Sequence, residues 1–303
     1  MRAFETADHP WLDIHTTVED YVEPQYYERL LRPYVFLCGE DGEFMEDIEL
    51  LHAHAVSELE HRPIEDVLEL GIGTGRATDA ILELVSPCSY YAVDLSPRMI
   101  ASCQKKYRGN EQVLHLSQDD AISYLLDCDR RFDMACSLWS FSHAVHQNIL
   151  NRADGTERVE LAIRRLLTEL LRPGGTFFLI HVDTCSPEQK ILARQWNRVM
   201  EVFDEGHQSP SKQHVDAILA RLSDEGEVSV ASRRLVGREI LYSSLEKAME
   251  IFLNFHLESH FNDRPDLPEV YREVEQYLRQ YLREDGTVAV APGCFVYEVS
   301  RTG

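Results

Sequence analysis

The sequence predicts an α/β fold with one mostly parallel sheet of seven strands and helices on both of its faces. From residue 65 onward, short β-rich runs alternate with helix-length segments, which is typical of a parallel sheet. The first of these runs leads directly into a glycine-spaced turn and a helix. Two late β-like runs lack a crossover of the earlier kind, so we expect an antiparallel hairpin at the sheet edge, with an antiparallel C-terminal strand.

The predicted elements follow one another in a regular order. Strands are expected near residues 65–70, 89–94, 112–116, 132–138, 176–182, 228–235 and 294–299. Helices are expected near residues 75–85, 97–107, 119–126, 156–171, 243–260 and 268–283. Pro173 and the two glycines after it break the fourth helix and turn the chain into the fifth strand. We therefore expect one domain over residues 63–303, with helical insertions around 185–225 and 243–283.

Residues 1–62 hold no strand pattern that could start a sheet, and we expect them to form a helical N-terminal extension. Apolar residues at helical spacing predict one helix between Glu43 and Glu60. Tyr21, Tyr26 and Tyr27 form an aromatic group that could close over a substrate as a lid. Equally, these tyrosines could be buried between the helices and the sheet.

Charge and cysteine content exclude several classes of function. The chain has 303 residues, with 52 acidic against 30 basic side chains and a net charge of -22, which repels phosphate backbones and anionic membranes. Its seven cysteines form no CxxC pair, and it has neither a signal-peptide pattern nor an apolar run of membrane-spanning length. We therefore expect a cytoplasmic protein without nucleic-acid or membrane partners. The oligomeric state is left open.

The turn after the first predicted strand is the strongest candidate for a ligand site. Residues 67–76 read Val-Leu-Glu-Leu-Gly-Ile-Gly-Thr-Gly-Arg. Glycines at the carboxyl end of a strand allow a sharp turn and a close approach to a ligand, and the helix that follows can attract a carboxylate. A nicotinamide site would have its third glycine one position later, where this chain has Arg76. The plain alternative is a tight turn without a ligand.

This pattern, Glu69-x-Gly71-x-Gly73-x-Gly75, resembles motif I of class I methyltransferases that use S-adenosylmethionine (SAM). The resemblance extends over about residues 64–183. It implies a Rossmann-like fold, SAM as the cofactor and S-adenosylhomocysteine (SAH) as its product. In this family the glycine loop holds the methionine part of SAM.

Two further segments match the family pattern. Asp94 ends the second strand, where the family's acidic residue binds the SAM ribose, and Met99 matches a residue under the adenine. The segment after the third strand resembles the family's Asp-Ala pair, whose carboxylate takes the adenine amino group; Asp120 is preferred over Asp119. These acids could instead only supply negative charge to a helix start. The remaining residues assigned to the cofactor site are Leu95, Ala121 and Ser137.

The acceptor side is expected around the end of the fourth strand. His143, a candidate general base, and His146 lie three residues apart and share a face if the segment is helical. A base is needed only for an acceptor that must lose a proton, and both histidines could simply be packed or solvated. Trp139, His181 and Asp183 are the other acceptor-side candidates. No metal is expected, because the acid that metal-dependent relatives carry after this strand is absent.

The sequence therefore predicts a SAM-dependent methyltransferase, of the 2.1.1 enzyme class, that acts on a small-molecule acceptor such as a secondary metabolite. The methylated atom, oxygen, nitrogen or carbon, is not determined. The alternatives are a nicotinamide-dependent oxidoreductase on a similar sheet and a non-catalytic SAM-binding partner protein. Titration with SAM and with NADH separates the first alternative from the prediction.

Overall fold

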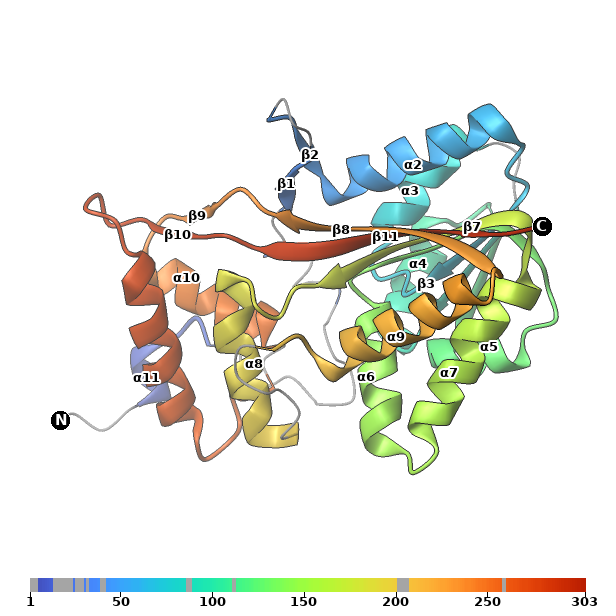
Figure 1. Cartoon of the computed structure of the whole chain (residues 1–303). Helices are drawn as coiled ribbons and strands as arrows, with labels where there is room; N and C mark the ends of the chain where they lie inside the picture. Colours follow the sequence, from blue (N-terminus) through green and yellow to red (C-terminus); the bar gives the residue numbers. More distant parts are fainter. Residues whose placement is uncertain are drawn as a thin grey trace.

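The computed structural model describes residues 5–12, 24, 30, 33–38, 42–85, 89–110, 113–200, 207–257 and 260–303. Its centre is a seven-stranded sheet in the order β5-β4-β3-β6-β7-β11-β8 (Figure 1). The strands are β3 (Asp66–Leu70), β4 (Ser89–Asp94), β5 (Leu114–Gln118), β6 (Phe132–Leu138), β7 (Leu171–Val182), β8 (Val228–Val236) and β11 (Gly293–Arg301). Strands β3 to β7 pair in parallel, and β11 is antiparallel to both of its neighbours. The predicted fold class is confirmed.

The two late strands pair differently from the expected hairpin. Strands β8 and β11 are antiparallel along their whole length, from the pair Gly293–Val236 to the pair Arg301–Val228. However, residues 237–292 lie between them in the chain, and β11 is inserted between β7 and β8. A strand with two neighbours is buried, which explains why Cys294, Val296 and Val299 are almost fully enclosed.

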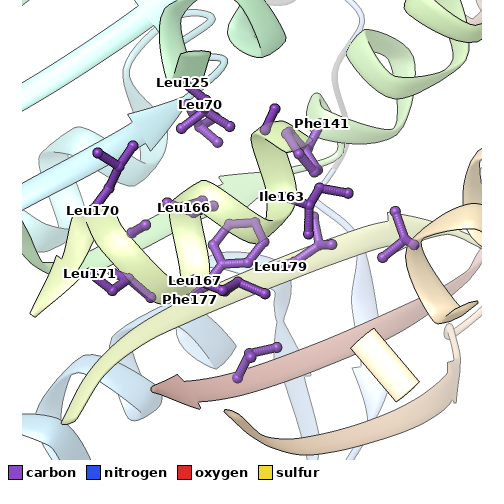
Figure 2. Close-up of a cluster of buried hydrophobic side chains, with 14 of the residues drawn as sticks. Leu70, Leu125, Phe141, Ile163, Leu166, Leu167, Leu170, Leu171, Phe177 and Leu179 are labelled. Atoms are coloured by element: carbon purple, nitrogen blue, oxygen red, sulfur yellow. The ribbon is translucent and has the colours of Figure 1, made fainter. Parts of the chain in front are cut away.

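Helices cover both faces of the sheet because side chains of each strand alternate between the faces. On one face, Leu68 and Leu70 of β3 pack under α5 (Ala121–Asp127), α6 (Phe141–Asn151), α7 (Gly155–Arg165) and α9 (Pro210–Asp224). Figure 2 shows this cluster, in which Phe177 and Leu179 of β7 meet Leu166 and Leu167 of the π-helical segment η2 (Leu166–Leu170). On the other face, Val67 packs under α2 (Asp47–His61), α3 (Arg76–Leu84) and α4 (Pro97–Lys106).

A third hydrophobic cluster is formed largely by late segments of the chain, and we call them the cap. The cap contains α8 (Pro187–Met200), β9 (Ile240–Tyr242), α10 (Leu245–Ile251), the π-helical η3 (Phe252–His256), α11 (Leu267–Leu278), the 3-10 turn η4 (Arg279–Tyr281) and β10 (Val288–Val290). Strands β9 and β10 pair as a separate antiparallel sheet. The expected insertion around 185–225 is therefore divided: α8 belongs to the cap, whereas α9 packs on the main sheet.

The N-terminal extension contains strands that the sequence analysis did not predict. After the 3-10 turn η1 (Thr6–Asp8), strands β1 (Val35–Leu37) and β2 (Phe44–Glu46) form an antiparallel pair. Each has only three residues, which is too short for a visible alternation, and Phe36 of β1 docks beside Gly237 at the end of β8. The predicted helix is present as α2, which begins with a capping box between Glu46 and Glu49.

Tyr21, Tyr26 and Tyr27 lie outside the described residues. Across the described ranges, no helix is long and apolar enough to cross a membrane.

Candidate functional site

The candidate site is a cavity of about 230 Å³ at the carboxyl ends of the central strands. The strand order reverses between β3 and β6, and ligands of such sheets bind at this switch point. Eleven of the residues singled out in the sequence line the cavity: Glu69, Gly71, Gly73, Asp94, Leu95, Met99, Asp119, Asp120, Ala121, Trp139 and His143. The cofactor and acceptor candidates thus meet in one place.

The three glycines of the loop have different tasks. All have positive φ, 89° at Gly71, 52° at Gly73 and 81° at Gly75. A Cβ atom at Gly71 would lie 2.0 Å from the Ser140 hydroxyl, and one at Gly75 would lie 2.2 Å from the Tyr107 hydroxyl. A Cβ at Gly73 would meet no atom within 4 Å. Gly71 and Gly75 therefore permit packing, whereas Gly73 leaves open space in the cavity wall. Gly75 itself does not line the cavity.

Glu69 is a buried carboxyl group directly below the loop. It accepts hydrogen bonds from the Thr78 hydroxyl at 2.6 Å and the Tyr90 hydroxyl at 2.7 Å. Burial raises the pKa of Glu69 to about 7, although both bonds act in the opposite direction. The two bonds hold the carboxyl group in one orientation at the cavity floor.

Asp94 presents its carboxyl group from the end of β4. It accepts hydrogen bonds from the N–H of Gly73 at 2.8 Å and of Ser96 at 2.9 Å. Burial raises the pKa of Asp94 above 3.8, while these two bonds lower it. A carboxylate has about four acceptor positions, so capacity remains for further hydroxyl donors. Ser96 also caps α4, because its side chain accepts from the N–H of Met99.

The two acids after β5 differ in their contacts. Asp120 caps α5 by accepting from the Ser123 N–H at 2.9 Å, and both of its oxygens contact Asn148 of α6. Asp119 accepts through Oδ1 from the N–H of Asp120, and its own N–H donates to the Asp94 carbonyl. Asp120 therefore has a structural role at the junction of two helices, although it also lines the cavity.

Trp139 stands at the junction of the cofactor and acceptor sides. Among the residues that the structure describes, it is the one non-glycine residue with positive φ, at 66°. Its Nε1 donates to Asp47 at 2.9 Å, and its ring lies 4.8 Å from the ring of Tyr34. The αL backbone costs free energy for a bulky residue, so these contacts must hold the indole in this position.

His143 and His146 lie on α6, which begins at Phe141. His143 lines the cavity and is exposed there, and desolvation by the protein around it lowers the pKa of its ring below 6.5. His146 is 8% exposed and does not line the cavity; burial and the neighbouring His143 lower its pKa to about 4. Both rings are therefore neutral at pH 7, and only His143 reaches the cavity.

Three other candidates do not line the cavity. Ser137 is buried; its hydroxyl donates to the Leu70 carbonyl at 2.6 Å and accepts from the N–H of Phe141. His181 is fully buried, with Nε2 3.4 Å from the Ser211 hydroxyl and a pKa lowered to about 4 by burial. Asp183 forms an ion pair of 2.7 Å with Arg234. These contacts connect neighbouring elements rather than present the side chains to the cavity.

The cavity also has walls that the sequence analysis missed. Tyr34 and Ile48 come from the N-terminal extension, and Gln147 comes from the turn of α6 after His143. Arg76 directly follows the glycine motif, and this adjacency was a signal that could have identified it. No local pattern points to Tyr34 or Ile48, because only long-range docking brings them here. No group of three His, Cys, Asp or Glu side chains in the described segments is arranged to hold a metal ion.

The fold and this site are similar to those of class I methyltransferase domains. In agreement, residues 67–175 match the family model described as "Methyltransferase domain". The matched segment runs from β3 into β7 and contains the glycine loop, Asp94 and His143. The match to methyltransferases therefore covers the part of the chain that forms the glycine loop and the ends of the central strands.

Curated relatives with similar sequence are large synthases. The chain is 34% identical over 110 residues to reducing polyketide synthase Preu2 of Preussia isomera, covering 36% of the chain and 4% of the synthase. It is 27% identical over 146 residues to hybrid PKS-NRPS synthetase lepA of Aspergillus flavus, covering 47% of the chain and 3% of the synthetase. The chain thus spans less than a tenth of the length of these relatives.

Among solved structures, the YcgJ protein of Bacillus subtilis aligns with a TM-score of 0.50 and 15% identity over 83% of this chain and 99% of that one. A putative sarcosine dimethylglycine methyltransferase from Galdieria sulphuraria aligns with a TM-score of 0.47 and 14% identity, over 84% and 85% of the two chains. At this level of identity the likeness concerns the fold alone.

Proposed function

We propose that the chain is a SAM-dependent methyltransferase of the 2.1.1 class that methylates a small-molecule acceptor in this cavity. One observation carries the proposal: the cavity wall has open space at Gly73, and the carboxylate of Asp94, which accepts from the Gly73 N–H at 2.8 Å, lines the same cavity beside it. A nucleoside joined to an amino acid needs both features, a backbone it can approach closely and a carboxylate for ribose hydroxyls.

The lining residues fit SAM in three parts. The loop of Gly71 and Gly73 takes the methionine part, and Asp94 accepts from the ribose hydroxyls. Leu95 and Met99 supply apolar surface for the adenine. Asp119 is a better partner than Asp120 for the adenine amino group, because the oxygens of Asp120 already serve Ser123 and Asn148. This assignment reverses the preference drawn from the sequence.

The acceptor chemistry follows from the residues beyond the glycine loop. SAM supplies an electrophilic methyl group on a sulfonium sulfur, so the protein mainly has to align the acceptor and exclude water. The aromatic rings of Trp139 and Tyr34 provide a wall that excludes water. A ring nitrogen of His143 accepts the proton of an acceptor that must lose one, since its lowered pKa keeps the ring neutral at pH 7.

A small acceptor, including a secondary metabolite, is supported by the relatives, which are polyketide synthases. The net charge of -22 opposes nucleic acids as substrates. We further propose that residues 1–62 act as a lid over the domain formed by residues 63–303, because Tyr34 and Ile48 already reach the cavity from this extension.

The experiment is a turnover screen with methyl-labelled SAM. The purified chain is incubated with panels of phenols, amines and β-carbonyl thioesters, and labelled product and SAH are measured against reactions without acceptor. Acceptor-dependent SAH formation is expected. SAM affinity without turnover on any panel would favour a non-catalytic SAM-binding protein. Affinity for NADH without affinity for SAM would favour an oxidoreductase.

A further inference from the structure

A single buried carboxylate joins three segments at the cavity. Asp47, the first residue of α2, is fully enclosed. It accepts hydrogen bonds from Nη1 and Nη2 of Arg76 at 3.2 and 2.8 Å, and from Nε1 of Trp139 at 2.9 Å. The N–H of Ile48 donates to it as well, at 2.9 Å. Asp47 therefore connects the N-terminal extension to the start of α3 and to the loop after β6.

The partners of Asp47 explain why this buried charge is tolerated. A buried carboxylate is costly unless a cation and several donors satisfy it. Here a guanidinium group, an indole N–H and a backbone N–H all contact one carboxylate. The arrangement is rigid because each donor comes from a regular element or from the strained position at Trp139.

Arg76 is the other half of this arrangement, and it faces the cavity. It follows Gly75, begins α3 and lines the same cavity as Gly71 and Gly73. Its side chain is 31% exposed. A guanidinium group has five N–H donors in a planar fork, and the two hydrogen bonds to Asp47 leave donors for a second anion.

The charges around the cavity give Arg76 a specific task. Among the described residues that line the cavity, Arg76 is the one arginine or lysine, whereas Glu69, Asp94, Asp119 and Asp120 are acids. A ligand with its own carboxylate would be repelled by these acids everywhere except beside Arg76. The methionine part of SAM carries such a carboxylate, and Arg76 is adjacent to the loop proposed to hold that part.

We propose that Arg76 binds the carboxylate of the SAM amino-acid moiety and that Asp47 is a positioning residue that orients Arg76 for this contact. The inference rests on the proposed function, because it concerns the same cofactor. An acceptor carboxylate has the same chemistry, so the test must show which molecule Arg76 recognises.

Calorimetric titration with two ligands makes this distinction. One ligand is SAH, and the other is decarboxylated SAH, which lacks only that carboxylate. The change Arg76→Gln should lower the affinity for SAH roughly 10- to 100-fold, the loss expected for a charge-assisted hydrogen bond. The affinity for decarboxylated SAH should change less than about threefold. The SAH affinity of Arg76→Lys should lie between those of wild type and Arg76→Gln, since a lysine ammonium is charged but lacks the planar fork of donors. Asp47→Asn should give a smaller loss that is again selective for SAH.

Two controls keep the test interpretable. Arg62→Gln alters another arginine bound at α2, at the opposite end of that helix, where it contacts Glu58 and the Asp133 carbonyl. Both affinities should stay unchanged in this variant. Removing Arg76 alone leaves Asp47 buried without its cation, which could destabilise the fold. The double variant Asp47→Asn/Arg76→Gln removes both charges, and circular dichroism checks that it folds. This variant should show the same selective loss of SAH affinity.

The outcomes separate the two levels of the proposal. Equal weakening of both ligands by Arg76→Gln would reduce the Asp47–Arg76 pair to a structural contact and overturn the inference. Unchanged SAH affinity would overturn it too, and would leave an acceptor carboxylate as the remaining partner. A wild-type chain that binds neither SAM nor SAH would instead overturn the proposed function itself.

Discussion

The two sides of the cavity are built in different ways. On the cofactor side, the site is formed by the glycine loop after β3 and by the end of β4. These elements are close to one another in the sequence. On the acceptor side, the wall combines Tyr34 from the extension with Trp139 and His143 from the loop and helix after β6. His181 and Asp183 of the late β7 region are instead bound to Ser211 and Arg234. Local sequence therefore describes the first side far better than the second.

The largest expected effect is on chemistry at the acceptor side. With an acceptor that must lose a proton, His143→Ala should lower kcat by roughly 10²–10⁴, with SAH affinity nearly unchanged. Because desolvation lowers the pKa of His143, wild-type activity should rise with pH through a midpoint below 6.5 and level off about one to two pH units above that midpoint. His146→Ala, matched in residue type, should have a smaller effect, since that ring does not line the cavity. A small decrease in kcat for His143→Ala, together with wild-type activity that does not fall at acidic pH, would indicate that catalysis depends on alignment of the acceptor alone.

A second effect concerns stability behind the acceptor wall. Glu188 of α8 is buried beside the Tyr34 hydroxyl and His256, and burial raises its pKa to about 7. The native state therefore keeps a proton that the unfolded chain releases near pH 4.5. This stabilising contribution is complete below pH 4.5 and is lost as pH rises to about 7.

The variant Glu188→Gln isolates this contribution, because glutamine does not titrate. Relative to wild type, its free energy of unfolding should rise by up to about 3 kcal/mol between pH 4.5 and 7. Chemical denaturation at a series of pH values measures the difference, and SAH affinity at pH 7 should be unaffected. A difference in free energy of unfolding that stays constant from pH 4.5 to 7 would show that Glu188 does not keep its proton in the native state.

A smaller effect is expected on the cofactor side. Asp94→Ala should weaken the binding free energy of SAH by roughly 1.5–3 kcal/mol, the usual loss for hydrogen bonds to a charged group. The fold should remain intact, because the carboxylate otherwise serves only the N–H groups of Gly73 and Ser96. Calorimetric titration gives the affinity, and normal binding by this variant would move the ribose contact to another residue.

The same contrast explains how far sequence analysis could go. The bounds of β4 and β6 agree with the predicted strands at 89–94 and 132–138, because each strand is a buried apolar run with clear ends. The pair β1–β2 was missed, since three-residue strands show no periodicity and depend on docking to β8. The wall residue Tyr34, which directly precedes β1, was missed for the same reason.

Polar residues at strand ends were the other source of difference. His181 and Asp183, at and just after the end of β7, were expected on the acceptor side, yet α9 and β8 provide partners for them. Strand position alone does not reveal such partners, which come from segments thirty to fifty residues away in the chain. Ser137 is similar: its place at the end of β6 was predicted, but its contact with the Leu70 carbonyl depends on the neighbouring strand.

If the open space at Gly73 receives SAM, the variant Gly73→Ala should reveal it when it is titrated with SAH. Gly174→Ala is the matched control, because Gly174 also has positive φ, at 73°, and a Cβ there would likewise meet no atom within 4 Å. Both changes should destabilise the fold by a similar amount, about 1 kcal/mol, through backbone strain. We predict that only Gly73→Ala loses SAH affinity, by tenfold or more. Equal affinity of wild type, Gly73→Ala and Gly174→Ala for SAH would show that SAM does not occupy the space at Gly73.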